Sequence, residues 1–315
     1  MNAYRAPAQD PRMLPAPPEV LARLRNVPTR AAPATLLFGG MLGAPVLFGV
    51  LAGVVGGLGI DALAVVFGVL AFLFFIGFVV FGWVSIFTAA TRIARAEQAV
   101  QAGDYASATR DALRVVKTVF RADYQMAGLF VLALTAERLG AFAEAGALFA
   151  RALDMIPAMA ASRPGARARA LLGAHAAIDF AAAGDRVRAQ QMLMRCNMAV
   201  GAVYQPSSGL GSLFDDSGMG AIGINAMLGK IEGARDPRPL AVLASMVVAF
   251  KDGQPAQAAQ IFAAEQASIG WGLAPHERAL AERIHGESLR LTSGAAPQQG
   301  ALVGPAGDWA ALVLR

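Results

Sequence analysis

Cysteine is almost absent from this chain of 315 residues, and lysine is scarce. The one cysteine, Cys196, excludes an internal disulfide and any metal centre built from several thiolates. Its helical neighbours Met192, Leu193 and Val200 favour a buried apolar role. The net charge of +5 is small and resides partly in the first 34 residues, so the remainder is nearly neutral. We therefore expect no nucleic-acid partner.

Motifs for catalysis and cofactor binding are also missing. Residues 218–223 match the dinucleotide pattern G-x-G-x-x-G, but residues 213–217 do not form the β-strand that this site requires. His276 and His285 are nine residues apart, which does not fit a zinc-binding H-E-x-x-H helix. His175 is expected on the repeat surface. We expect no catalytic residue, metal site or cofactor, and hence no enzyme.

Charge is missing from residues 35–88, where Asp61 is the one exception. A helix needs about 20 apolar residues to cross the hydrocarbon core of a membrane. Residues 35–55 and 62–88 are long enough, and the glycine-rich segment 56–61 between them can only be a tight turn. The sequence therefore predicts a transmembrane helical hairpin.

Arginines flank this hairpin on its outer ends. Arg23, Arg25 and Arg30 precede it, and Arg92 and Arg95 follow it, whereas the turn carries no basic residue. Basic residues stay on the cytoplasmic side of a membrane, so both termini and the region after the hairpin should be cytoplasmic. The preference for Arg, Ala and Gly is typical of a bacterial protein, which places the chain in the bacterial inner membrane.

Small residues recur at intervals of four in the first predicted span. This spacing lets another helix approach closely, and the glycines concerned are Gly39, Gly43, Gly49 and Gly53. Two interpretations remain open. The glycines either pack against the second span near Ala64 and Gly68 or form a contact between two copies of the chain.

Glycines punctuate the rest of the chain at nearly regular intervals. They stand at Gly103, Gly140, Gly184, Gly218 and Gly253, with spacings of 37, 44, 34 and 35. A period near 34 is typical of paired-helix repeats.

The unit at 129–157 shows the pattern most fully. Small, glycine and aromatic residues follow one another at fixed positions, namely Ala133, Gly140, Phe142, Ala145, Phe149, Ala152 and Pro157. In type and spacing this unit resembles the tetratricopeptide repeat (TPR) family. Two positions depart from the family pattern: Arg92 and Gly173 stand where a bulky residue is usual.

The resemblance implies an all-α chain with a TPR-like solenoid of about four helix pairs. Repeats one to three would occupy residues 89–200. Repeat four and a capping helix would occupy residues 239–291. Residues 201–238 are either a glycine-rich insertion or a degenerate repeat, and both interpretations remain open.

Both ends of the chain are predicted to have little regular secondary structure. Residues 1–34 are rich in proline and predict a disordered cytoplasmic arm, in which residues 19–26 can form two turns on the membrane surface. Residues 292–315 predict a flexible tail with a short apolar end around Trp309, Leu312 and Val313.

In TPR solenoids the first helices of successive repeats line a concave groove. Transferred by register, the groove positions of this chain are Phe130, Leu134, Glu137, Leu171, Ile178, Leu243, Val247 and Phe250. They are mostly apolar, so the resemblance implies a partner with an apolar helix or extended peptide. The alternative is that they pack against neighbouring repeats. A further hypothesis is that the apolar tail occupies this groove.

Four basic residues recur at helical spacing after the hairpin: Arg110, Arg114, Lys117 and Arg121. They predict either a face that contacts membrane lipids or a merely solvated face. Together these observations favour a membrane-anchored TPR scaffold that binds a protein partner. The alternative is a structural subunit of a transport, secretion or envelope-assembly complex, docked through its hairpin.

Overall fold

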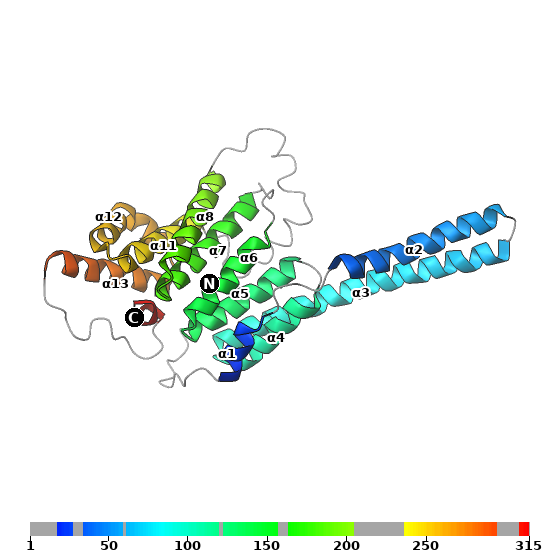
Figure 1. Ribbon diagram of the computed structural model, residues 1–315, viewed down its shortest axis with the longest axis horizontal. Coiled ribbons are helices and arrows are strands. Elements are labelled where there is room, and N and C mark those ends of the chain that lie inside the picture. Colours follow the sequence, from blue (N-terminus) through cyan, green and yellow to red (C-terminus); the bar gives the residue numbers. More distant parts are fainter. Residues whose placement is uncertain are drawn as a thin grey trace.

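The computed structural model describes residues 18–27, 34–58, 61–119, 122–156, 163–204, 236–294 and 309–314. Within these ranges every regular element is an α-helix and no β-strand is present. The expected all-α class is therefore confirmed. Figure 1 shows a long two-helix arm that projects from a body of stacked helices.

The arm consists of α2 (Ala34–Gly57) and the first part of α3 (Asp61–Gln101). The two helices run antiparallel and contact each other, and the ring of Phe48 stacks on those of Phe67 and Phe74. The predicted second span ends at residue 88, but α3 continues without a break to Gln101. The second helix of the arm and the first helix of the body are thus one helix of 41 residues.

Large apolar side chains of the arm face outward. Phe72, Trp83 and Phe87 have 62%, 71% and 70% of their surface exposed. Among the residues whose placement the structure describes, no helix combines the length and the apolar character that would make it a candidate membrane span.

The body begins where α3 ends, and its helices form antiparallel pairs. The last part of α3 pairs with α4 (Tyr105–Thr118), α5 (Ala122–Arg138) with α6 (Phe142–Asp154), α7 (Arg163–Ala182) with α8 (Arg186–Tyr204), and α11 (Pro237–Lys251) with α12 (Pro255–Gly272). Helix α13 (Pro275–Thr292) covers α12 and α11 at the far end.

A glycine turns the chain within each of these four pairs. Gly103, Gly140, Gly184 and Gly253 have positive φ angles of 77°, 71°, 81° and 78°. This left-handed conformation strains any residue with a Cβ atom, so glycine is the residue that fits there. Four of the five predicted turns are therefore confirmed, and Gly218 lies outside the described residues.

Alanine allows the helices of the body to approach one another. Ala133, Ala145 and Ala152 are fully buried where neighbouring helices meet. Larger side chains fill the remaining space, and the rings of Phe130 and Phe149 meet edge to face at 5.6 Å. Close packing of small and large residues is what the repeat pattern predicts.

Gly173 has a specific packing role that the repeat pattern does not show. A Cβ atom at this position would lie 3.1 Å from the Cβ atom and 3.2 Å from the Cα atom of Cys196. Helix α7 therefore approaches the backbone of α8 too closely for a side chain. Glycine fits this position because it brings no Cβ atom into the contact.

The third and fourth pairs are direct neighbours. Helix α11 packs against both α7 and α8, so no further helix pair separates them. The Tyr204 hydroxyl donates a hydrogen bond to the Asp236 carboxylate, which joins the end of α8 to the start of α11. The segment 205–235 itself, including most of the predicted insertion or degenerate repeat, lies outside the described residues.

Residues 18–27 of the proline-rich N-terminal segment, which was predicted to be disordered, form a helix and the turn that follows it. Helix α1 (Pro18–Arg25) contacts α4 and α5, and it buries Val20, Leu24 and Val27 in the core of the body. Arg25 Nε lies 2.8 Å from Glu144 Oε1. Residues 18–27 are thus an ordered part of the body, because their apolar side chains at spacings of four and three cover a helical surface.

Candidate functional site

The residues predicted to line a groove lie mostly inside the body. Phe130, Glu137, Leu171, Ile178, Leu243 and Val247 are buried, and Leu134 and Phe250 are partly buried. They do not line an open groove, which corrects the predicted site. Packing against neighbouring helices, the alternative interpretation, describes their position.

A cluster of ionisable side chains is buried among these residues. His175 on α7 is 6% exposed, and its Nδ1 atom lies 3.4 Å from Glu137 Oε1 on α5. Its ring stacks on Phe149 at 4.9 Å and meets Phe130 edge to face. The expected surface position of His175 is therefore wrong. Asp179, one helical turn further along α7, is completely buried.

The surroundings of Asp179 disfavour its ionised form. Burial raises the pKa of its carboxyl group well above the ordinary 3.8, and repulsion from the Glu137 carboxylate raises it further, whereas His175 opposes the shift. Two carboxyl groups and an imidazole thus share one buried site, in which burial and the neighbouring carboxylate both favour the neutral form of Asp179. Sequence patterns missed this cluster because Glu137 belongs to a different helix from His175 and Asp179.

The C-terminal tail is docked onto the body. Helix α14 (Trp309–Leu314) contacts α13 and also α7, the helix that carries His175 and Asp179. Trp309, Val313 and Leu314 are 7%, 0% and 7% exposed. The Trp309 ring meets His276 of α13 edge to face at 5.4 Å. The apolar tail therefore packs on α7 and α13, and its predicted occupation of the groove stays a hypothesis; the side chain of Leu312 lies outside the described residues.

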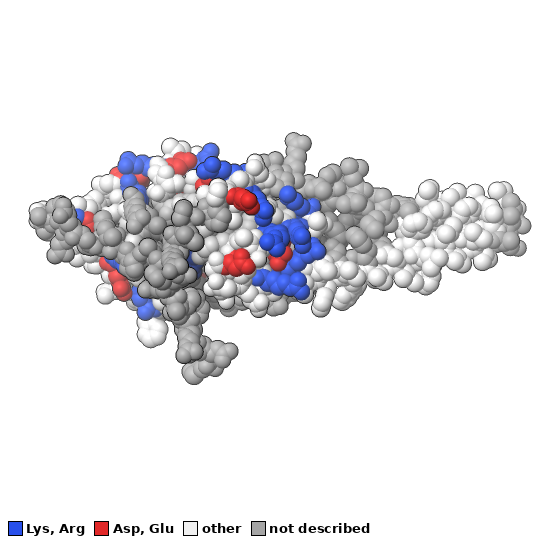
Figure 2. All heavy atoms as spheres, turned by 90° about the horizontal axis from the view of Figure 1, so that it is seen from below, with Lys and Arg blue, Asp and Glu red and all other residues white. Residues whose placement is uncertain are grey.

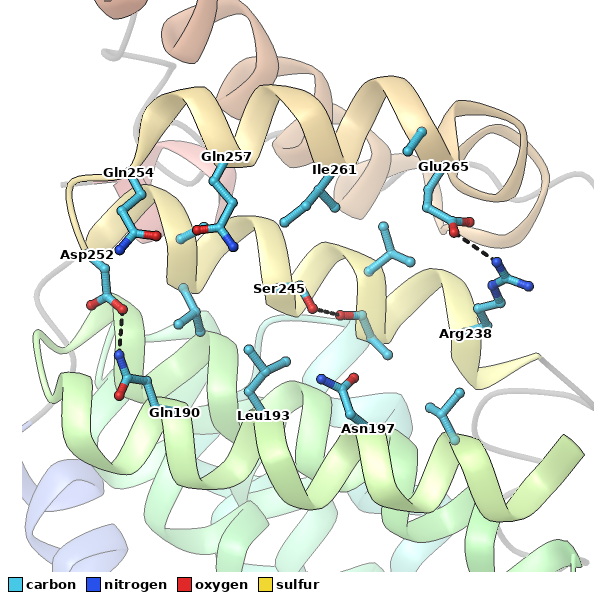
Figure 3. Close-up of a pocket in the computed structure, with 16 residues that line it drawn as sticks. Gln190, Leu193, Asn197, Arg238, Ser245, Asp252, Gln254, Gln257, Ile261 and Glu265 are labelled. Atoms are coloured by element: carbon cyan, nitrogen blue, oxygen red, sulfur yellow. Dashed lines mark hydrogen bonds and ion pairs between the residues drawn. The ribbon is translucent and has the colours of Figure 1, made fainter. Parts of the chain in front are cut away.

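An open cleft of about 710 Å³ runs between α8, α11 and α12. Figure 3 shows α11 as its floor, with Gln190, Leu193 and Asn197 on one side and Gln254, Gln257 and Ile261 on the other. Apolar side chains line its middle. The cleft arises because α11 packs on both α7 and α8, whereas α12 packs mainly on α11 and α13 and leaves space between itself and α8.

Polar contacts close both ends of this cleft. At one end Gln190 Nε2 donates a hydrogen bond of 2.8 Å to Asp252, and at the other Arg238 pairs with Glu265 at 2.8 Å. The charged groups therefore bind one another. The cleft otherwise presents neutral amide side chains around an apolar floor.

The predicted basic stripe lies on the surface. Arg110, Arg114 and Lys117 are exposed on α4, and Arg121 lies outside the described residues. Figure 2 shows Lys and Arg side chains gathered on the part of the body that adjoins the arm. Helix α1 adds Arg23 beside Lys117 in a small pocket. Arg23 was not predicted to belong to the basic stripe. The spacing of the apolar residues of α1 could have indicated that this helix packs on the body.

The glycines of the arm do not all serve the contact between α2 and α3. A Cβ atom on Gly49 or Gly53 would meet no atom within 4 Å, whereas one on Gly56 would lie 3.5 Å from the Cβ atom of Ala64. Packing of Gly49 and Gly53 against the second helix is therefore wrong. The surroundings of Gly39 and Gly43 lie outside the described residues.

The described residues hold no group of three His, Cys, Asp or Glu side chains placed to bind a metal ion. Comparison with known proteins identifies no relative: no family model, curated protein or solved structure matches the chain.

Proposed function

We propose that this protein is a membrane-anchored, TPR-like scaffold of the bacterial inner membrane that binds an apolar helical segment of a protein partner. The observation that carries the proposal is the docked tail. Helix α14 is short and apolar, and it packs on α7 and α13, which supports the proposal that this surface binds such a helix. We propose that a partner segment of similar chemistry takes its place.

The exposed apolar surface of the arm supports anchoring in a membrane. Burying side chains such as Phe72 and Leu73 in lipid is favourable by about 25 cal/mol per Å² of apolar surface. Trp83 and Phe87 lie at the end of the arm next to the body, where aromatic rings favour the membrane interface. Since no described helix qualifies as a span by its own apolar length, insertion must be measured directly.

The manner of tail attachment supports exchange with a partner. Residues 293–308 separate α13 from α14, so release of α14 need not disturb any other described helix of the body. Its six residues form too short a helix to be stable alone in water, and its order therefore depends on the surface beneath it. A longer partner helix that is stable by itself would lose less conformational entropy when it becomes ordered on this surface.

A peptide added to the truncated chain tests this proposal. We expect a labelled peptide of residues 308–315 to bind a chain that ends at residue 294, measured by fluorescence anisotropy in detergent. The intact chain should bind the peptide more weakly, because its own α14 competes at high effective concentration. A peptide with Val313→Asp is the matched control, since Val313 is fully buried. Equal binding to both chains would contradict the proposal.

The open glycines of the arm favour a second candidate function. A Cβ atom on Gly49 or Gly53 would meet no atom within 4 Å, so this face of α2 is open. Small residues on such a face let another membrane helix approach closely. A structural subunit of a transport, secretion or envelope-assembly complex would dock there. Replacement of Gly49 by Leu should then release co-purifying membrane subunits, whereas a scaffold that acts through α7 and α13 should keep its partner.

A further inference from the structure

We propose that the pocket between α1 and α4 binds the phosphate-bearing headgroup of an anionic membrane lipid. This site rests on the proposed anchoring of the arm in a membrane. The pocket has a volume of about 180 Å³ and is lined by Ala22 and Arg23 of α1, by Asn26 directly after this helix, and by Leu113 and Lys117 of α4. One water occupies about 30 Å³ of liquid, so the pocket holds a phosphate group with a few waters.

The pocket is built by the docking of α1. Val20 and Leu24 are 2% and 3% exposed, which fixes the helix on the body through its apolar side. Arg151 Nη1 donates a hydrogen bond of 3.3 Å to the carbonyl of Val27, and this contact holds the end of the segment. Arg23 and Asn26 are therefore presented beside Lys117 by a fixed element.

The side chains of the pocket suit a phosphate. An arginine, a lysine and an amide supply several hydrogen-bond donors, and the two cations supply charge. Glu19 lies 3.8 Å from Arg23, but its side chain is 82% exposed, so this pair is weak in water. Arg114 and Arg110 extend the positive charge along the exposed face of α4.

The position of the pocket favours a lipid as the source of the phosphate. Helices α3 and α4 run antiparallel about the turn at Gly103. This glycine is midway in sequence between Ala89 and Lys117, so those two residues lie at the same level. Ala89 directly follows the apolar part of α3. The pocket therefore lies at the level where lipid headgroups would surround the inserted arm. Figure 2 shows basic side chains gathered on the part of the body that adjoins the arm.

Lysine reactivity offers a direct test, because the chain has only three lysines. The full chain is reconstituted into phosphatidylcholine vesicles with or without about 30% phosphatidylglycerol. An amine-reactive reagent then labels Lys117, and Lys251 at the end of α11 serves as the internal control. We expect phosphatidylglycerol to protect Lys117 several-fold and to leave Lys251 unchanged. Raising the salt concentration should remove the protection, since salt screens the exposed charges.

Two variants sharpen the test. Arg23→Gln keeps the buried face of α1 and should weaken the protection of Lys117 by about fivefold. Arg195→Gln removes an exposed charge from α8 and should have no effect. Equal labelling of Lys117 in both kinds of vesicle would overturn the headgroup site and leave the proposed anchoring intact. A chain that enters neither kind of vesicle contradicts the anchoring and the site together.

Discussion

The imidazole of His175 lies against the carboxylate of Glu137, with Nδ1 and Oε1 3.4 Å apart and both side chains buried. The two residues belong to the third and second helix pairs, so their contact joins successive pairs across the body. Asp179 completes the cluster one turn along α7. Buried ionisable groups make the stability of the body depend on pH.

The pKa of Asp179 predicts the direction of this dependence. The unfolded chain loses the proton near pH 3.8, whereas the folded protein keeps it to a higher pH because burial disfavours the carboxylate. The folded state therefore binds more protons above about pH 4, and its stability falls as the pH rises through this window. We expect Asp179→Asn to be more stable than the natural chain near pH 7, with the difference shrinking toward pH 4.

Chemical denaturation between about pH 4 and pH 8 measures this difference. Asp154→Asn is the control, because Asp154 is an exposed carboxylate paired with Arg195. A loss of stability in Asp179→Asn that is equal at every pH would show that the body requires the carboxylate itself.

A second prediction concerns the close contact around α6. Ala145 is fully buried, whereas Ala147 on the same helix is exposed. Ala145→Leu should overfill the contact and lower the free energy of unfolding by about 1–3 kcal/mol. Ala147→Leu adds the same atoms in water and should change stability little. Similar unfolding curves for the two variants would contradict the helix packing described above.

A third prediction concerns Gly173. A methyl group there meets the backbone of Cys196 at 3.2 to 3.3 Å, and backbone cannot move aside as a flexible side chain can. Gly173→Ala should therefore lower the melting temperature, although alanine favours helices more than glycine does. Gly201→Ala on α8 is the matched control, because a Cβ atom there meets nothing within 4 Å. That variant should be as stable as the natural chain or more so.

The glycine turns and the order of the helix pairs could be predicted from the sequence, because each depends on local residues. The position of Gly140 after one helical pattern and before the next suffices to place its turn. Burial of the predicted groove residues could not be predicted, since it depends on how α11 and α14 pack on α7. The continuity of α3 has a local signal, because neither Gly nor Pro occurs between Ala89 and Gln101.

A fourth prediction concerns the one thiol of the chain. Cys196 is buried, its Sγ atom donates to the carbonyl of Ala170 at 3.2 Å, and burial raises its pKa to about 12. At pH 8 only about one thiol in ten thousand would be the reactive thiolate. We expect no reaction with maleimide until the body unfolds. Rapid labelling of the folded chain would show that α7 and α8 separate in solution.

Because the native thiol of Cys196 is not expected to react in the folded chain, insertion of the arm can be measured with single added cysteines. Leu73→Cys lies near the middle of the apolar part of α3, and Gln257→Cys lies on the exposed face of α12. Both are labelled with a membrane-impermeant maleimide in inner-membrane vesicles whose cytoplasmic side faces outward. We expect Gln257→Cys to react in intact vesicles, whereas Leu73→Cys should react only after detergent is added. Labelling of Leu73→Cys at the same rate as Gln257→Cys in intact vesicles would contradict the anchoring of this protein in the membrane.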